Sequence, residues 1–120
     1  MKRNVLFGAA ALLIFTHVHA EKTDLQLTGT QGVHMFFTVS SPWSENQKYL
    51  EGVLRGVCYG KPVCFSHVWK KGDAAPRKFP LSDKAVATEL ATFQQNKHTG
   101  LNKLLWSCKR FQVTDKTKCF

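Results

Sequence analysis

Residues 53–69 constrain the possible fold of this chain more than any other stretch. An apolar-striped segment ends there, a turn (Tyr59-Gly60-Lys61-Pro62) lies between two cysteines, and a β-branched and aromatic run follows. Helical spacing stops at the left edge of this stretch, and strand composition begins at its right edge. We therefore expect a helix, a turn and a strand in succession, with the cysteines holding the turn closed.

The N-terminus has the pattern of a cleaved secretory signal over residues 1–20. A short basic head precedes an apolar run over residues 5–15, and Val18 and Ala20 occupy the positions that a signal peptidase reads. The run is shorter than the roughly 20 apolar residues that cross a bilayer, which disfavours an uncleaved anchor. We expect an exported chain, periplasmic or extracellular, with residues 21–120 as a single small domain.

All four cysteines lie within residues 21–120, and an oxidising destination favours two disulfides. Three pairings are possible. The local pairing is favoured, Cys58 with Cys64 and Cys108 with Cys119, because the turn brings the first two cysteines together. Loop entropy does not favour it, since the short loops contribute about 2.4 and 2.8 kcal/mol and long-range bridges about 4 kcal/mol each.

The first half of residues 21–120 predicts two strands around one helix. Residues 33–39 and 63–69 have strand composition, and residues 21–32 fit an edge strand or an arm. A helix between the strands is expected to begin at Ser41-Pro42 or at Ser44, the first residue of a capping box. Its apolar stripe has helical spacing, and Gly56 is expected to end it. The stripe consists of Leu50, Val53, Leu54 and Val57.

The second half predicts a helix and a third strand. Ser82 has the properties of an N-cap, and Leu81 and Val86 have the spacing of a hydrophobic staple. This helix is expected to run to about Gly100, with Val86, Leu90 and Phe93 on its buried face. Residues 104–111 fit the third strand.

The element order β-α-β-α-β predicts an α+β, or small α/β, single domain. We expect a three- or four-stranded sheet, two helices on one face, and stapling by the disulfides. The strand–helix–strand unit is typical of a right-handed parallel crossover.

Positive charge is confined to the C-terminal half. Residues 21–69 contain four Lys or Arg and four Asp or Glu, whereas residues 70–120 contain eleven and four. This asymmetry favours a solubilising cationic surface over a core that contains the tryptophans. The alternative is an anion-binding surface just after the second cysteine. The candidate binding residues are His67, Trp69, Lys70, Lys71, Arg77 and Lys78. Further bases could extend the surface: Lys97, Lys103, Lys109, Arg110, Lys116 and Lys118.

Motifs for catalysis, cofactors or metals do not occur in the sequence. It contains neither G-x-S-x-G nor a phosphate-binding or dinucleotide glycine pattern. The histidines His34, His67 and His98 do not have zinc-ligand spacing, and oxidised cysteines are not ligands. We therefore predict no catalytic, cofactor-binding or metal-binding residues.

These observations favour a non-enzymatic exported protein that binds another macromolecule, such as an inhibitor, an immunity-type protein or an accessory factor. The alternative is a cationic binder of an anionic surface: membrane head groups, nucleic acid or an acidic glycan. A small hydrolase is a third possibility, for which His67 and His98 would be the first residues to test.

Overall fold

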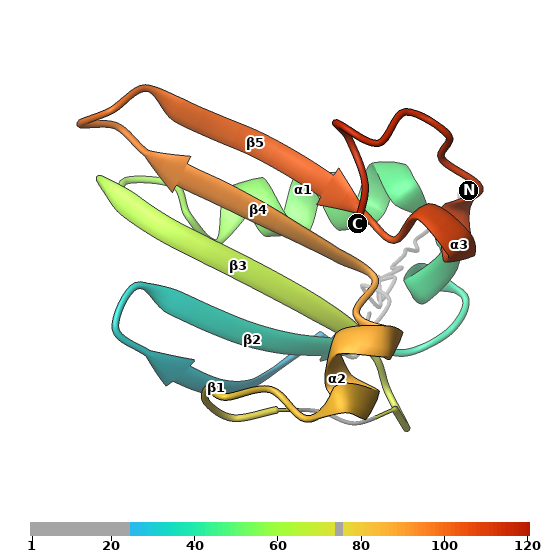
Figure 1. Cartoon of the computed structure of the whole chain (residues 1–120). Helices are drawn as coiled ribbons and strands as arrows, with labels where there is room; N and C mark the ends of the chain where they lie inside the picture. Colours follow the sequence, from blue (N-terminus) through green and yellow to red (C-terminus); the bar gives the residue numbers. More distant parts are fainter. Residues whose placement is uncertain (1–24, 74–75) are drawn as a thin grey trace, which may run out of the picture.

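A computed structural model of the chain describes residues 25–73 and 76–120 (Figure 1). Its centre is a five-stranded sheet with the strands in sequence order. The strands are β1 (Gln26–Gln31), β2 (His34–Val39), β3 (Val63–Lys70), β4 (Ala91–Asn96) and β5 (Leu101–Trp106). The helices are η1 (Trp43–Glu45), α1 (Gln47–Gly56), α2 (Asp83–Thr88) and α3 (Cys108–Phe111).

The topology confirms the α+β class, but the sheet contains more strands than expected. The sheet has five strands, not three or four, because residues 26–31 form an edge strand and residues 91–96 form a central one. β2 and β3 are parallel and are joined through α1, as the strand–helix–strand pattern predicts. The other neighbours are antiparallel. Within the described residues, no helix is long and apolar enough to span a membrane.

The expectation that both helices share one face is wrong. Figure 1 shows α1 behind the sheet and α2 in front of it, at the end where β3 finishes. On the α1 side, Leu50 and Leu54 are fully buried and the Ser66 hydroxyl donates to the Leu54 carbonyl at 2.9 Å. This side holds the larger core: Phe37, Val39, Leu50, Leu54, Cys58, Cys64, Val68, Leu90, Ala91 and Phe93.

α1 begins later than either expected cap. Asn46 is the N-cap, and its side chain accepts from the Tyr49 N–H at 2.9 Å. Ser44 is buried with its hydroxyl 3.3 Å from that of Ser41, so neither hydroxyl caps this helix. The helix ends at Gly56, as expected.

The opposite face is covered by residues 76–90, which we call the cover segment. Trp69 lies beneath it, fully buried, and its indole N–H donates to the Ala85 carbonyl at 2.7 Å. Phe36 and Ala85 are buried with Trp69, and Phe79 and Leu81 pack against this second cluster. The two faces of the sheet therefore have separate cores.

The helix expected from Ser82 to Gly100 is wrong beyond its first two turns. Ser82 is the N-cap, as predicted, but α2 ends at Thr88 and the chain becomes extended. The staple is not made either, since Val86 is 56% exposed. The Leu90 N–H donates to the Val68 carbonyl, and residues 91–96 pair with β3 on one side and β5 on the other. These ladder hydrogen bonds replace the helical ones.

The third predicted strand is displaced toward the N-terminus. β5 ends at Trp106, where Ser107 caps α3 and the chain turns back. The Trp106 N–H donates to the Lys118 carbonyl, and the Phe120 N–H donates to the Trp106 carbonyl. Gly100 has a φ of 80° and lies in the β4–β5 turn, not at a helix end.

Both local disulfides are confirmed. Cys58–Cys64 joins the end of α1 to the start of β3 inside the larger core. Cys108–Cys119 joins α3 to the C-terminal tail. The signal peptide expected over residues 1–20 lies outside the described residues.

Substitution of Gly29 tests the close contact between the cover segment and β1. A Cβ at Gly29 would lie 2.6 Å from the Arg77 Cα and 2.8 Å from its carbonyl carbon. Because backbone atoms cannot yield as a flexible side chain can, Gly29→Ala is expected to lower the free energy of unfolding by about 1–3 kcal/mol. Urea denaturation measures the change.

Gly52→Ala is the matched control. Nothing lies within 4 Å of a Cβ at Gly52, which is inside α1. Alanine should raise the free energy of unfolding there by about 0.5–1 kcal/mol. A Gly29→Ala variant as stable as the wild type would contradict the close packing.

Candidate functional site

The fold creates a crevice where the parallel strands end. After β2 the chain crosses to the α1 side, and after β3 it crosses to the cover-segment side. Adjacent parallel strands whose connections leave on opposite faces open a gap at their carboxyl ends, where α/β proteins commonly bind ligands. The ends of these strands, Val39 and Lys70, are register partners.

A pocket of about 430 Å³ lies at this end of the sheet. We call it the crevice. Four parts of the chain contribute to it: η1, the end of β3, the residue just before β4, and α3. It is lined by Ser44, Glu45, Lys70, Leu90, Arg110 and Phe111.

Two cations and one carboxylate give the crevice its charge. Lys70 is half-buried at the end of β3, and Glu45 is exposed on η1. The Arg110 guanidinium donates to the Asp73 carboxylate at 3.3 Å, and a third of the Arg110 side chain remains exposed. The crevice therefore presents one lysine and one partly neutralised arginine beside the apolar surfaces of Leu90 and Phe111.

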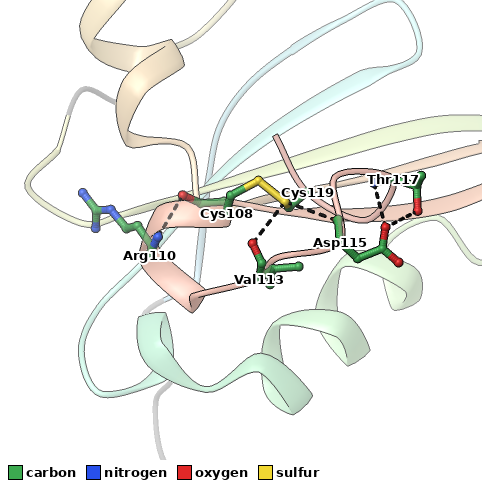
Figure 2. The surroundings of a disulfide bond; sticks show 7 residues. Cys108, Arg110, Val113, Asp115, Thr117 and Cys119 are labelled. Carbon is green, nitrogen blue, oxygen red and sulfur yellow. Dashed lines mark hydrogen bonds between the residues drawn. A yellow bond between two sulfur atoms is a disulfide. The ribbon is translucent and has the colours of Figure 1, made fainter.

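The Cys108–Cys119 disulfide holds the element that carries Arg110. The Ser107 hydroxyl accepts from the Arg110 N–H at 3.3 Å and starts α3. In Figure 2 the Arg110 side chain extends away from the disulfide, while Cys119 lies against Val113 and the tail. The disulfide thus attaches the tail to the start of α3, and Arg110 on the same helix lines the crevice.

The predicted binding residues do not form one surface. Lys70 lines the crevice, and Lys71 is the exposed residue after it. Arg77 and Lys78 are exposed on the cover segment, where the Arg77 backbone crosses β1 at Gly29.

Trp69 and His67 lie below the surface. Trp69 is fully buried and His67 is 8% exposed, so a partner at the surface would not stack on that indole. Of the crevice residues, sequence reasoning placed Lys70 in the first set and Arg110 in the wider basic set. Ser44, Glu45 and Phe111 carried no sequence signal that separated them from other polar or core residues.

A second polar cluster lies on the cover-segment side of the sheet. His34 Nδ1 is 3.0 Å from His67 Nε2, across the β2–β3 pair. His67 Nδ1 is 2.9 Å from Glu89 Oε2 and 3.1 Å from the Thr92 hydroxyl. Glu89 is 9% exposed and Thr92 is 6% exposed. We call His34, His67 and Glu89 the imidazole–carboxylate chain.

The hydrogen bonds of this chain determine its protonation. A carboxylate accepts only, so His67 Nδ1 carries the proton that is donated to Glu89. One further proton lies between the two imidazoles. Burial, and then the neighbouring His67, lower the pKa of His34 below its usual value of 6.5.

Aromatic rings surround the two imidazoles. The Phe79 ring meets His34 edge to face, with centroids 4.6 Å apart, and Phe36 stacks on His67 at 5.3 Å. Phe65 lies against His34 from the same strand as His67. Among the described residues, no group of three or more His, Cys, Asp or Glu is arranged to hold a metal ion.

Comparisons of the chain with protein-family models, with curated proteins and with solved structures found no significant match. The arguments about function therefore rest on the geometry of the crevice and of the imidazole–carboxylate chain.

Glu89 tests how much the imidazole–carboxylate chain contributes to stability. Glu89→Leu removes the acceptor for the His67 N–H, which then has only the Thr92 hydroxyl. Loss of a buried hydrogen-bond partner should lower the free energy of unfolding by about 1–3 kcal/mol in urea denaturation at neutral pH. Glu89→Gln keeps an acceptor oxygen and should lose less. Equal losses for the two variants would contradict the role of the hydrogen bond.

Proposed function

We propose that the chain is an exported, non-enzymatic binding protein whose crevice takes an acidic group of a protein partner. The observation that carries this proposal is the placement of Lys70 and Arg110 in one pocket with Leu90 and Phe111. A carboxylate held by a lysine and an arginine, with its methylene groups against apolar side chains, would satisfy both parts of this lining.

Two features support export. The two disulfides are of the kind that persists in oxidising compartments. The N-terminal residues have the pattern of a secretory signal.

The neighbouring carboxylates favour a compact acidic group over an extended polyanion. Glu45 lines the crevice, and Asp73 pairs with Arg110. Both carboxylates would repel the successive charges of nucleic acid or of an acidic glycan, whereas a single carboxylate can lie between the two cations. A protein surface that offers one Asp or Glu among apolar residues therefore fits the crevice better.

The crevice is better suited to binding than to hydrolysis. Its one hydroxyl, on Ser44, lies 3.3 Å from the hydroxyl of Ser41, which is not a general base. The imidazoles of the second cluster face the other side of the sheet, and His67 is engaged at both ring nitrogens. Nucleophilic catalysis needs a base beside the nucleophile.

Charge reversal in the crevice tests the proposal. A fluorescent peptide with one Glu between apolar residues serves as the probe, and fluorescence anisotropy measures its dissociation constant. Lys70→Glu should weaken binding about tenfold or more, because a charge-assisted hydrogen bond is replaced by repulsion. Arg110→Gln should weaken it in the same direction.

Lys116→Glu is the matched control, since it makes the same charge change on the exposed C-terminal tail. It should leave the dissociation constant within about twofold of the wild-type value. Equal weakening by Lys70→Glu and Lys116→Glu would contradict the crevice and favour a diffuse cationic surface. Heparin and phosphatidylglycerol vesicles, tested in parallel, report on that alternative through their salt dependence.

A further inference from the structure

The cover segment depends on few contacts with the strands beneath its first half. The Thr28 hydroxyl donates to the Pro76 carbonyl at 2.9 Å, and the Phe79 N–H donates to Gln31 Oε1 at 2.6 Å. The other attachments are the close approach of the Arg77 backbone to Gly29 and the packing of Leu81 on the second cluster. The Phe79 ring completes them, since it packs on His34, Phe36 and His67. No helix or strand includes residues 76–82. The imidazole pair is therefore part of the surface that holds this half in place.

The imidazole pair accommodates one proton between its facing nitrogens. With both rings neutral, His34 Nδ1 donates to His67 Nε2. With His67 protonated, His67 Nε2 donates to His34 Nδ1, and the added charge lies beside Glu89. Both arrangements keep the 3.0 Å contact. With both rings protonated, two N–H groups would face each other 3.0 Å apart, so the hydrogen bond cannot form.

We propose that the imidazole pair is an acid-sensitive latch, in which protonation of both rings separates His34 from His67 and releases residues 76–82 from β1 and β2. His34 is the ring that moves, because it is half-buried and touches Phe79, whereas His67 is held by Glu89 and Thr92. Its displacement removes the nearest of the three rings on which Phe79 packs, and Phe36 and His67 remain.

Glu89 is the charged group in direct contact with the imidazole pair. Glu89, at the end of α2, contacts His67 directly. On β1 and β4 the neighbours are Gln31 and Thr92, which do not titrate. Lys70 is half-buried at the far end of β3. The other charged residues of the packed elements are exposed: Arg77, Lys78, Asp83, Lys84 and, on β5, Lys103. Solvent screens these exposed side chains from the imidazole pair.

The linkage between proton binding and folding gives the direction in which pH changes the stability of the latch. The pKa of His34 is lower in the folded chain than in the unfolded chain, so the unfolded or released form binds the proton more readily. The latch is therefore closed above about pH 6.5 and loses stability as the pH falls below that value. The crevice lies at the opposite end of β2 from His34, so its binding of an acidic probe can be measured separately.

Hydrogen exchange of the folded chain tests the latch. Protection factors, corrected for intrinsic rates, are compared at about pH 7.5 and about pH 5. The Phe79 amide should lose at least about tenfold in protection at the lower pH. The Leu50 amide in α1, bonded to the Asn46 carbonyl, should change by less than about twofold. Equal losses at both amides would mean global unfolding and would overturn the proposal.

Two variants distinguish protonation of His34 in the latch from protonation of a histidine elsewhere in the chain. His34→Gln keeps a side-chain donor for His67 but cannot take up a proton, so Phe79 protection should no longer depend on pH. His98→Gln, at an exposed position in the β4–β5 turn, should behave as the wild type does. Retention of the full pH response in His34→Gln would overturn the proposal.

Wild-type NMR gives a result that does not depend on a variant folding. The ring signals of His34 should titrate with the same midpoint as the loss of Phe79 protection. Titration of His34 without any change at Phe79 would overturn the latch. A midpoint shared with the loss of Phe79 protection would support it.

Discussion

The parallel pairing of β2 with β3 is the constraint on which the rest of the structure depends. Its register sets His34 against Phe65, Phe36 against His67 and Val39 against Lys70. Parallel strands require a crossover, which α1 provides, and the disulfide at the end of α1 returns the chain to the start of β3. One pairing thus places the two imidazoles side by side and sets the end of β3 in the crevice.

The two faces of the sheet are stabilised in different ways. The α1 face is an apolar core in which the first disulfide is buried. The cover-segment face buries a carboxylate and an imidazole, which is costly unless each is hydrogen-bonded. Glu89 and His67 satisfy each other at 2.9 Å, and Thr92 lies within reach of the same nitrogen. A polar cluster under a short cover segment makes this face the one that responds to protonation.

Local chemistry accounts for the parts of the fold that sequence reasoning predicted. The turn between Cys58 and Cys64 brings its own ends together, so composition and proximity suffice to predict that disulfide. The Ser82 hydroxyl caps the first turn of α2 at a position three residues from its partner, Ala85. Each of these features depends on residues that are close in the chain.

Residues 89–96 are a segment whose structure local sequence patterns did not predict. Leu90 and Phe93 are three apart, a spacing typical of one helix face, and both are buried, as predicted. Hydrogen bonds to β3 and β5 instead place Phe93 in a strand, with Leu90 just before it. The contact of His34 with His67, and the meeting of Lys70 with Arg110, likewise join residues distant in the chain. The sequence alone determined the two local disulfides, the Ser82 cap and the strands β2 and β3 through local forces. Only the tertiary structure decided the sheet partners, the crevice and the imidazole pair, because these depend on register between distant segments.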